Sequence, residues 1–427
     1  MVCVRERMRM EEMGHLLVFG FLFFFATFMV APAITDVTME ALCPGRDECS
    51  LAIYLTGLQQ AISGIGSLVA TPVVGNLSDR YGRKTLLMLP SAASILPSVI
   101  LAWNRTKVFF YAYYITKMVA GMVAEGSVQC LCLAYVADKV PQARRAAAFG
   151  VFSGVCTAGL VAGTVAARFL TVPSTFQVSS VAAATATVYM RAFVQETDGG
   201  ANSSDDSAAS PVLPPLRKAL SPSEAAALLT SSSTFSRAAL VTFFYSLGET
   251  GLQTALLYFL KAQFHYTKNQ YADLLLVIGI AGSLSQLVVM PVLAPKLGEQ
   301  KLLTISLLGS SMNGFLYSIA WSPWVPYLVA SFVIVSILVN PCIRSIVSKG
   351  AGPFEQGMAQ GCLTGISSTA SVISPVVFTP LTAWFLSETD APFNFKGFSL
   401  ACAGFAVLVA LTVSINMRPA EFQPDSK

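Results

Sequence analysis

The chain has 427 residues, of which 54% are hydrophobic and only 12% are charged. A soluble domain carries about 25% charged residues, so this chain could not cover its surface in water. The net charge of +4 is small and lies in short loops, and it indicates no nucleic-acid partner. The composition therefore predicts an integral membrane protein built from α-helices.

Twelve apolar segments are long enough to cross a bilayer, which takes about 20 helical residues. In chain order the predicted transmembrane helices are 14–40, 51–75, 85–103, 107–137, 146–170, 173–193, 237–262, 271–293, 301–321, 325–347, 355–386 and 396–416. Segment 194–236 is rich in Ser, Gly, Pro and Asp, which is typical of a flexible linker. We therefore predict two six-helix halves, residues 1–193 and 237–427, joined by a cytoplasmic linker.

Lys and Arg residues are distributed unevenly over the loops. With the N-terminus inside, thirteen lie in short inner segments and seven in outer loops, which favours cytoplasmic termini. Both a plasma membrane and an endomembrane fit this pattern. The loop after the first helix reads C-P-G-R-D-E-C, and a disulfide bond between Cys43 and Cys49 is plausible there if that side is oxidising.

The second and third predicted helices are joined by Gly75-Asn-Leu-Ser-Asp79-Arg80-Tyr-Gly82-Arg83-Lys84. These charges cannot lie in hydrocarbon, so we expect a short cytoplasmic hairpin. The pattern G-x-L-x-D-R-x-G-R-K resembles the signature loop of the major facilitator superfamily. The resemblance implies a conformational latch, in which Asp79 lies at the N-terminus of the eleventh helix. Arg83 and Lys84 would contact acids or lipid phosphates, and Gly75 and Gly82 would permit close approach and a tight turn.

Two matches at nearly the same period indicate a duplicated half. Overlaying this hairpin on Pro291-Val-Leu-Ala-Pro295-Lys296-Leu-Gly298 aligns Gly82 with Gly298, 216 residues later. Overlaying 148–154 on 359–365 aligns two glycines in each segment at an offset of 211 residues. Parallel repeats of this kind occur in facilitator-type transporters. In the second copy of the hairpin, Pro295 replaces the acid.

Eight of the predicted helices have no ionisable side chain within their apolar bodies, and four helices are exceptions. An ionised group inside a bilayer costs several kcal/mol, so each one needs a partner, a wet cavity or a function. The ionisable residues there are Asp36 in the first helix, Lys117 and Glu125 in the fourth, Glu249 in the seventh and Arg344 in the tenth. In the major facilitator fold these four helices line the central cavity, so the resemblance implies a cavity role. A structural role at the membrane boundary fits Asp36 and Arg344 equally well.

Glu249 lies near the middle of its helix. Gly248 and Gly251 flank it and Gln253 follows, a combination that we expect to weaken the helix and to favour contact with a solute or a proton. Removal from water favours the neutral form of a carboxyl, so Glu249 and Glu125 could titrate during transport. We therefore expect proton coupling.

Two further segments resemble superfamily motifs with one substitution each. In the fourth helix Lys117 stands four residues before Gly121, where the motif carries Arg; Lys keeps the charge but loses the planar fork. The fifth helix resembles the glycine-rich motif of drug/proton antiporters, with Thr164 in place of Pro. Close helix packing is the simpler interpretation of its small residues, Gly150, Gly154, Gly159 and Gly163.

The whole chain outside the linker resembles the branch that holds tetracycline-efflux proteins and hippocampus-abundant-transcript-like proteins. The resemblance rests on N-L-S-D-R-Y-G-R-K, on A-Y-V-A-D ending at Asp138, and on F-E-Q-G-M-A-Q-G ending at Gly361. It implies a secondary transporter that moves a small solute by alternating access. The alternatives are a passive uniporter, in which Lys117 neutralises an acid, and a transport-inactive scaffold or sorting protein, which Thr164 and Pro295 would fit.

An enzymatic role is not expected. The chain lacks a G-x-x-x-x-G-K-S/T loop, which argues against pumping by ATP. Its two histidines, His15 and His265, lie at helix ends, so neither a metal centre nor another cofactor is expected. We expect a monomer whose partners are the solute, protons and membrane lipid.

Overall fold

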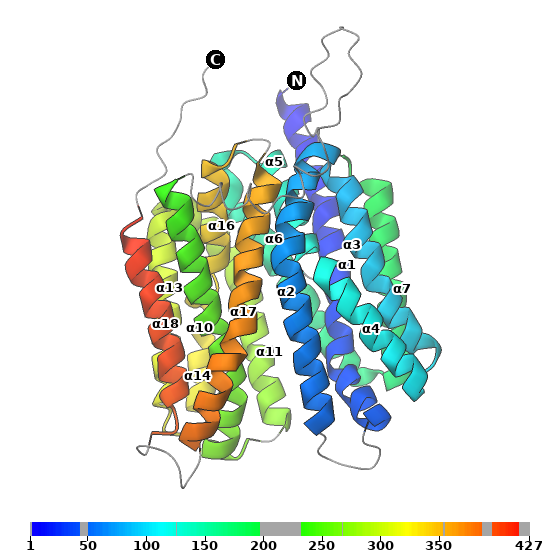
Figure 1. Ribbon diagram of the computed structural model, residues 1–427. Coiled ribbons are helices and arrows are strands. Elements are labelled where there is room, and N and C mark those ends of the chain that lie inside the picture. Colours follow the sequence, from blue (N-terminus) through cyan, green and yellow to red (C-terminus); the bar gives the residue numbers. More distant parts are fainter. Residues whose placement is uncertain are drawn as a thin grey trace. The chain divides into compact units, whose positions relative to one another are not determined.

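The computed structural model describes residues 2–42, 50–124, 126–196, 232–266, 268–352, 355–386 and 395–417 (Figure 1). Every regular element in this part of the chain is a helix. Nine helical stretches in it are long and apolar enough to cross a membrane. The all-helical membrane architecture is thereby confirmed, while the number of twelve transmembrane helices stays a prediction.

Most helices of the first half of the sequence begin and end close to the predicted positions, but α1 begins at Val2 and not at residue 14, and α2 ends at Tyr81 and not at residue 75. The elements are α1 (Val2–Leu42), α2 (Ser50–Tyr81), α3 (Arg83–Trp103), α4 (Lys107–Ala124), α5 (Ser127–Lys139), the 3-10 turn η1 (Gln142–Arg144), α6 (Arg145–Phe169) and α7 (Val172–Phe193). The fourth predicted helix is therefore divided into α4 and α5.

In the second half, two predicted helices are interrupted. The elements are α10 (Ser233–Phe264), α11 (Lys268–Leu284), the π-helical turn η2 (Ser285–Val289), α12 (Met290–Leu297), α13 (Glu299–Ser318), α14 (Val325–Ser331), α15 (Val333–Ser336), α16 (Val339–Gly350), α17 (Gln356–Leu386) and α18 (Phe398–Ile415). The π turn comes just before Pro291, whose missing N–H removes one regular helical hydrogen bond.

The chain divides into two compact units, and helices α6 and α17 each contribute to both. The first unit holds the described residues within 2–141, 152–196 and 355–368, and the second holds those within 142–151, 232–352 and 369–417. The predicted division into residues 1–193 and 237–427 stays a prediction.

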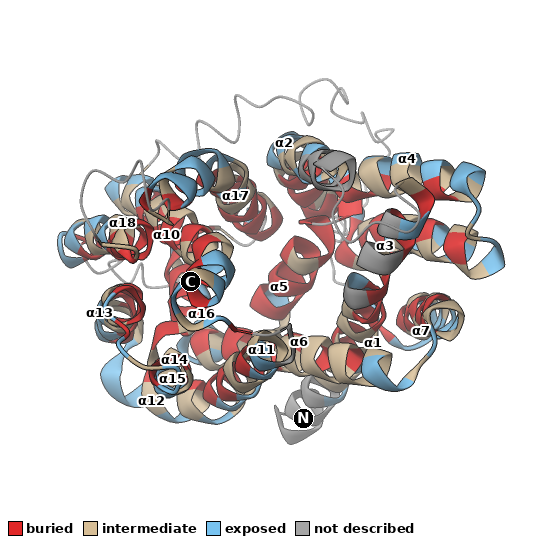
Figure 2. Ribbon diagram, turned by 90° about the horizontal axis from the view of Figure 1, so that it is seen from below, coloured by how far each residue is buried: buried red, intermediate tan, exposed pale blue. Residues whose placement is uncertain are grey.

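In the first unit, α1 packs against α7, and α3 packs against both α7 and α4. Their shared core consists of Val30, Ala33, Val37, Ala41, Leu101, Phe110, Tyr113 and Phe176. Helix α5 is buried from Cys130 to Ala137 and is mostly red in Figure 2. Its small and apolar residues let it lie inside the unit and carry Asp138 at its end.

In the second unit, α18 packs against α10 and α13. The core there includes Leu256, Phe259, Leu260, Tyr317 and Leu400. Gly248 and Gly251 do not break α10, which is continuous through both positions. A Cβ on Gly248 would lie 2.7 Å from the carbonyl oxygen of Ala403, so these glycines let neighbouring helices approach α10.

The two hairpins of the predicted repeat share one backbone conformation. Gly82 and Gly298 have φ angles of 95° and 77°, and ψ angles of 148° and 154°, a region that is essentially restricted to glycine. The amide of Gly82 donates to the carbonyl oxygen of Ser78 at 3.1 Å, and that of Gly298 donates to Ala294 at 3.1 Å. The internal repeat therefore has a counterpart in the backbone.

Candidate functional site

The sequence predicts a ten-residue hairpin between the second and third helices, whereas in the structure a single residue interrupts the helix there. Helix α2 continues to Tyr81 and α3 begins at Arg83, with Gly82 between them. The helix can extend through Ser78 and Asp79 because both side chains find partners within the first unit. The polar residues of the motif are thus held on helical backbone.

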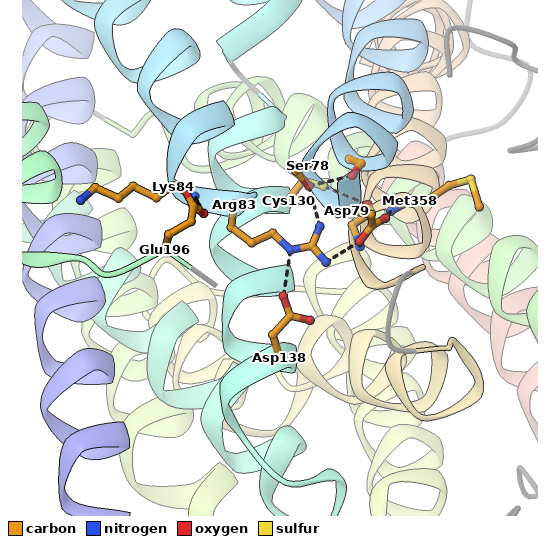
Figure 3. Close-up of polar contacts among 10 residues, drawn as sticks. Ser78, Asp79, Arg83, Lys84, Cys130, Asp138, Glu196 and Met358 are labelled. Atoms are coloured by element: carbon orange, nitrogen blue, oxygen red, sulfur yellow. Dashed lines mark hydrogen bonds and ion pairs between the residues drawn. The ribbon is translucent and has the colours of Figure 1, made fainter. Parts of the chain in front are cut away.

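Asp79 lies in the last turns of α2 and binds the first turn of α17 (Figure 3). Its Oδ1 accepts a hydrogen bond from the amide of Gly357 at 2.9 Å, and its Oδ2 accepts one from Met358 at 3.0 Å. These amides have no acceptor within their own helix, and the helix dipole favours an anion there. Asp79 is only 6% exposed, so its charge depends on these partners and on Arg83.

Arg83 joins three helices through its guanidinium group. Its Nε donates to Oδ2 of Asp138 at 2.9 Å, its Nη1 donates to Oγ of Ser78 at 2.5 Å, and its Nη2 pairs with Asp79. The Ser78 hydroxyl in turn donates to the carbonyl oxygen of Gly75 at 2.7 Å. The planar fork of Arg reaches the three acceptors from three separate nitrogens, whereas a lysine would have to reach them from a single nitrogen.

Glycines bring α2 and α17 into backbone contact beside this network. A Cβ on Gly75 would overlap the carbonyl group of Gly357, and one on Gly361 would lie 2.8 Å from the Cα of Pro72. The thiol of Cys130, on α5, donates to the Gly357 carbonyl oxygen at 3.5 Å. Small residues let helix backbones approach closely, and here the approach places Asp79 within reach of α17.

Glu196 is a site residue that the sequence did not reveal. It follows α7, in a segment predicted to be linker, and its carboxylate accepts hydrogen bonds from the amides of Lys84 at 2.8 Å and Thr85 at 3.0 Å. The Thr85 hydroxyl also donates to it at 2.8 Å. Glu196 therefore caps the N-terminus of α3, and no local motif could have connected residues this distant in the sequence. The side chain of Lys84 points away from Arg83 (Figure 3).

Glu249 occupies the middle of α10 in the second unit. Sixteen residues of the helix precede it and fifteen follow. It is half-buried, and its Oε1 accepts a hydrogen bond from Nε2 of the exposed Gln253 at 3.2 Å. The hydroxyls of Thr250 and Ser371 lie 3.2 Å apart on α10 and α17. A polar strip is thus present halfway along these helices.

The remaining predicted cavity residues are distributed over both units. Lys117 is half-buried on α4 in the first unit, and Arg344 is 8% exposed on α16 in the second. A shared cavity stays a prediction. The part of the chain that the structure describes does not include the side chain of Asp36 or any of Glu125, Cys43 and Cys49.

The predicted packing glycines of α6 lie against neighbouring helices. A Cβ on Gly159 would lie 2.7 Å from the carbonyl oxygen of Phe21 on α1. Gly163 meets the next turn of α1, Gly150 faces Met290 in the second unit, and Gly154 is buried. Among the described residues, no group of three or more His, Cys, Asp and Glu side chains is arranged to hold a metal ion.

Comparison with known proteins identifies the family. Residues 16–238 match the Major Facilitator Superfamily. The tetracycline resistance protein, class E, of Escherichia coli is 23% identical over 363 residues, which cover 83% of this chain and 84% of that protein. The Hippocampus abundant transcript 1 protein of Homo sapiens is 22% identical over 364 residues, which cover 85% of this chain and 72% of that protein.

A solved structure shows the same fold. The human organic anion transporter MFSD10 (TETRAN) superposes with a TM-score of 0.79 at 18% sequence identity, covering 95% of this chain and 99% of that one. The matched proteins are transporters rather than enzymes. The chain is a multi-pass membrane protein that belongs to the major facilitator superfamily.

Proposed function

We propose that this protein moves a small solute across its membrane by alternating access, and that protonation of Glu249 is coupled to the movement. Membership of a transporter family supports the transport step. The observation that carries the coupling step is the position of Glu249 halfway along α10.

The surroundings of Glu249 favour a group that exchanges a proton. Among the described residues it makes no ion pair, and its hydrogen-bond partner is the neutral amide of Gln253. An isolated carboxylate at this depth is costly unless it is hydrated or neutral. In one conformation of the protein, protonation of Glu249 removes the cost of burying its charge. In another conformation, access to water stabilises the charged carboxylate. A carboxyl that alternates between these conformations takes up and releases a proton, as coupling requires.

Two alternatives remain from the sequence. A passive uniporter would use Lys117 to neutralise an acid; the described residues show no ion pair of Lys117, and they include neither Glu125 nor the side chain of Asp36. A transport-inactive scaffold or sorting protein would have no use for a carboxyl in the middle of a helix.

The test is solute flux in proteoliposomes with and without a pH gradient, across a panel of small anions, cations and neutral solutes. We expect Glu249→Gln to lose gradient-driven flux while retaining solute exchange, because the amide cannot release a proton. Asp273→Asn, at an exposed acid on α11, is the matched control. Unchanged gradient-driven flux in Glu249→Gln would show that coupling lies elsewhere. Absence of flux for every solute in folded wild-type protein would favour the scaffold.

A further inference from the structure

The second hairpin carries an ion pair at its first helical residue. Glu299 begins α13 directly after Gly298, and its two carboxylate oxygens lie 2.6 and 2.7 Å from Nζ of Lys349 on α16. The Ser345 hydroxyl, one turn earlier on α16, donates to the same carboxylate at 3.3 Å. The two side chains are 14% and 27% exposed, so the pair is largely shielded from water.

These residues stand at the repeat positions of Arg83 and Asp138. Glu299 follows Arg83 by 216 residues, the offset of the two hairpins, and Lys349 follows Asp138 by 211 residues, the offset of the fifth and eleventh predicted helices. The helix ends agree as well. The amide of Val140 donates to the carbonyl oxygen of Val136 at 3.0 Å, and that of Ala351 to Val347 at 3.1 Å, also 211 residues later.

We propose that Glu299 and Lys349 are the charge-reversed counterpart of Arg83 and Asp138, and that they position the last turn of α16 in the second unit. Coulomb attraction does not depend on which partner carries which sign. The reversed order fits the helix dipoles better, because Glu299 lies at the N-terminus of α13 and Lys349 near the C-terminus of α16.

The dipoles explain why the two hairpins differ in their other residues. Arg83 lies at the N-terminus of α3, where a cation is unfavourable, and acids accompany it there: Asp79 on its guanidinium and Glu196 on the neighbouring amides. The negative charge of Glu299 itself complements the positive end of the α13 helix dipole. The acid of the motif is therefore dispensable in the second hairpin, where Pro295 stands in its place.

The turn that Lys349 stabilises is held from another side by Arg145. The Nη1 of Arg145, at the start of α6, donates to the carbonyl oxygen of Ser348 at 2.8 Å and to its hydroxyl at 3.1 Å. Ser348 is fully buried. A shift of this turn would move the Ser348 acceptor away from Arg145. The Glu299–Lys349 ion pair therefore supports the Arg145–Ser348 contact by holding the turn in position.

Hydrogen–deuterium exchange of the full chain in lipid nanodiscs, read at residues 345–351, tests the proposal without a solute. We expect Lys349→Gln to speed exchange about two- to fivefold, the effect of losing a partly exposed ion pair. Lys349→Glu should have a larger effect, and Glu299→Lys with Lys349→Glu should recover at least half of the lost protection. Lys301→Glu, at an exposed cation on α13, is the control and should change nothing there.

Positioning is separated from general stabilisation by combining variants. If the pair acts through Arg145, Lys349→Gln should add little to the exchange already caused by Arg145→Ala. Additive effects, unchanged exchange in Lys349→Gln, or a charge-reversed double variant no better than Lys349→Glu would each overturn the proposal. If Lys349→Glu does not fold, Lys349→Arg, which keeps the charge, must retain the wild-type protection that Lys349→Gln loses.

Discussion

Replacement of Asp79 by Asn tests the contact between α2 and α17 with the smallest change in shape. The carboxylate accepts two backbone hydrogen bonds, at 2.9 and 3.0 Å, and hydrogen bonds to a charged group contribute about 1.5–3 kcal/mol each. The Asn carbonyl oxygen keeps one neutral bond, worth about 1 kcal/mol, and its NH₂ group faces the other amide donor. From these two bonds we therefore expect a loss of about 2–5 kcal/mol.

The loss should be visible at the two amides themselves. A change of 1.4 kcal/mol is a factor of ten, so exchange at Gly357 and Met358 should rise roughly 30- to 4,000-fold in hydrogen–deuterium exchange of peptides covering 356–360. Glu40→Gln, at an exposed acid at the end of α1, should leave these amides unchanged. Unaltered protection in Asp79→Asn would refute the assignment of the carboxylate as the group that holds α17.

Four further substitutions probe the hairpins. Arg83→Lys should lower the melting midpoint of the purified protein, because the single Nζ of Lys cannot take the places of Nε, Nη1 and Nη2 at once, at a cost of about 1–3 kcal/mol; a wild-type midpoint would contradict this. Glu196→Gln should speed amide exchange at the start of α3 about 2- to 30-fold, the range for loss of a helix cap, and exchange at wild-type rates would show that the cap is dispensable. Gly298→Ala should cost about 1–3 kcal/mol from backbone strain alone, since nothing lies within 4 Å of the added Cβ. Gly82→Ala should melt at a lower temperature than Gly298→Ala, because its Cβ would also meet the Glu196 carboxyl group; the reverse order would refute this.

The features that could be predicted from the sequence are those that depend on residue type at a fixed local spacing. Apolar length predicted the helices, and the motif placed Asp79 near the start of α17, where the structure also has it. The overlay of the hairpins aligned Gly82 with Gly298 because both positions require a conformation that only glycine adopts easily. Each of these inferences rests on residue type at a fixed spacing.

Pairings between distant residues were not accessible in the same way. The partner of Arg83 lies 55 residues away on α5, and Glu196 lies 112 residues from the amide it caps. The overlay of the hairpins did not identify Glu299 because it compared residue types. The repeat keeps an ion pair at this position, but the acid and the base have exchanged places. Glycines around Glu249 suggested a weak helix, but the sequence does not show that neighbouring helices pack against them.

Asp79 has a property that would suit the predicted latch, in which its contact with α17 is made and broken during transport. Its carboxylate also pairs with Arg83, and that pair lies between residues four apart on α2 and α3. If α17 withdraws, Asp79 loses its two amide partners but keeps a cation, so it avoids the full penalty of an unpaired buried charge. Arg83 likewise keeps Asp138 and Ser78. Release of α17 then costs the two backbone hydrogen bonds, part of which water restores, and the packing of α17 against α2 at Gly75 and Gly361. We expect the network within α2, α3 and α5 to persist when the contact opens.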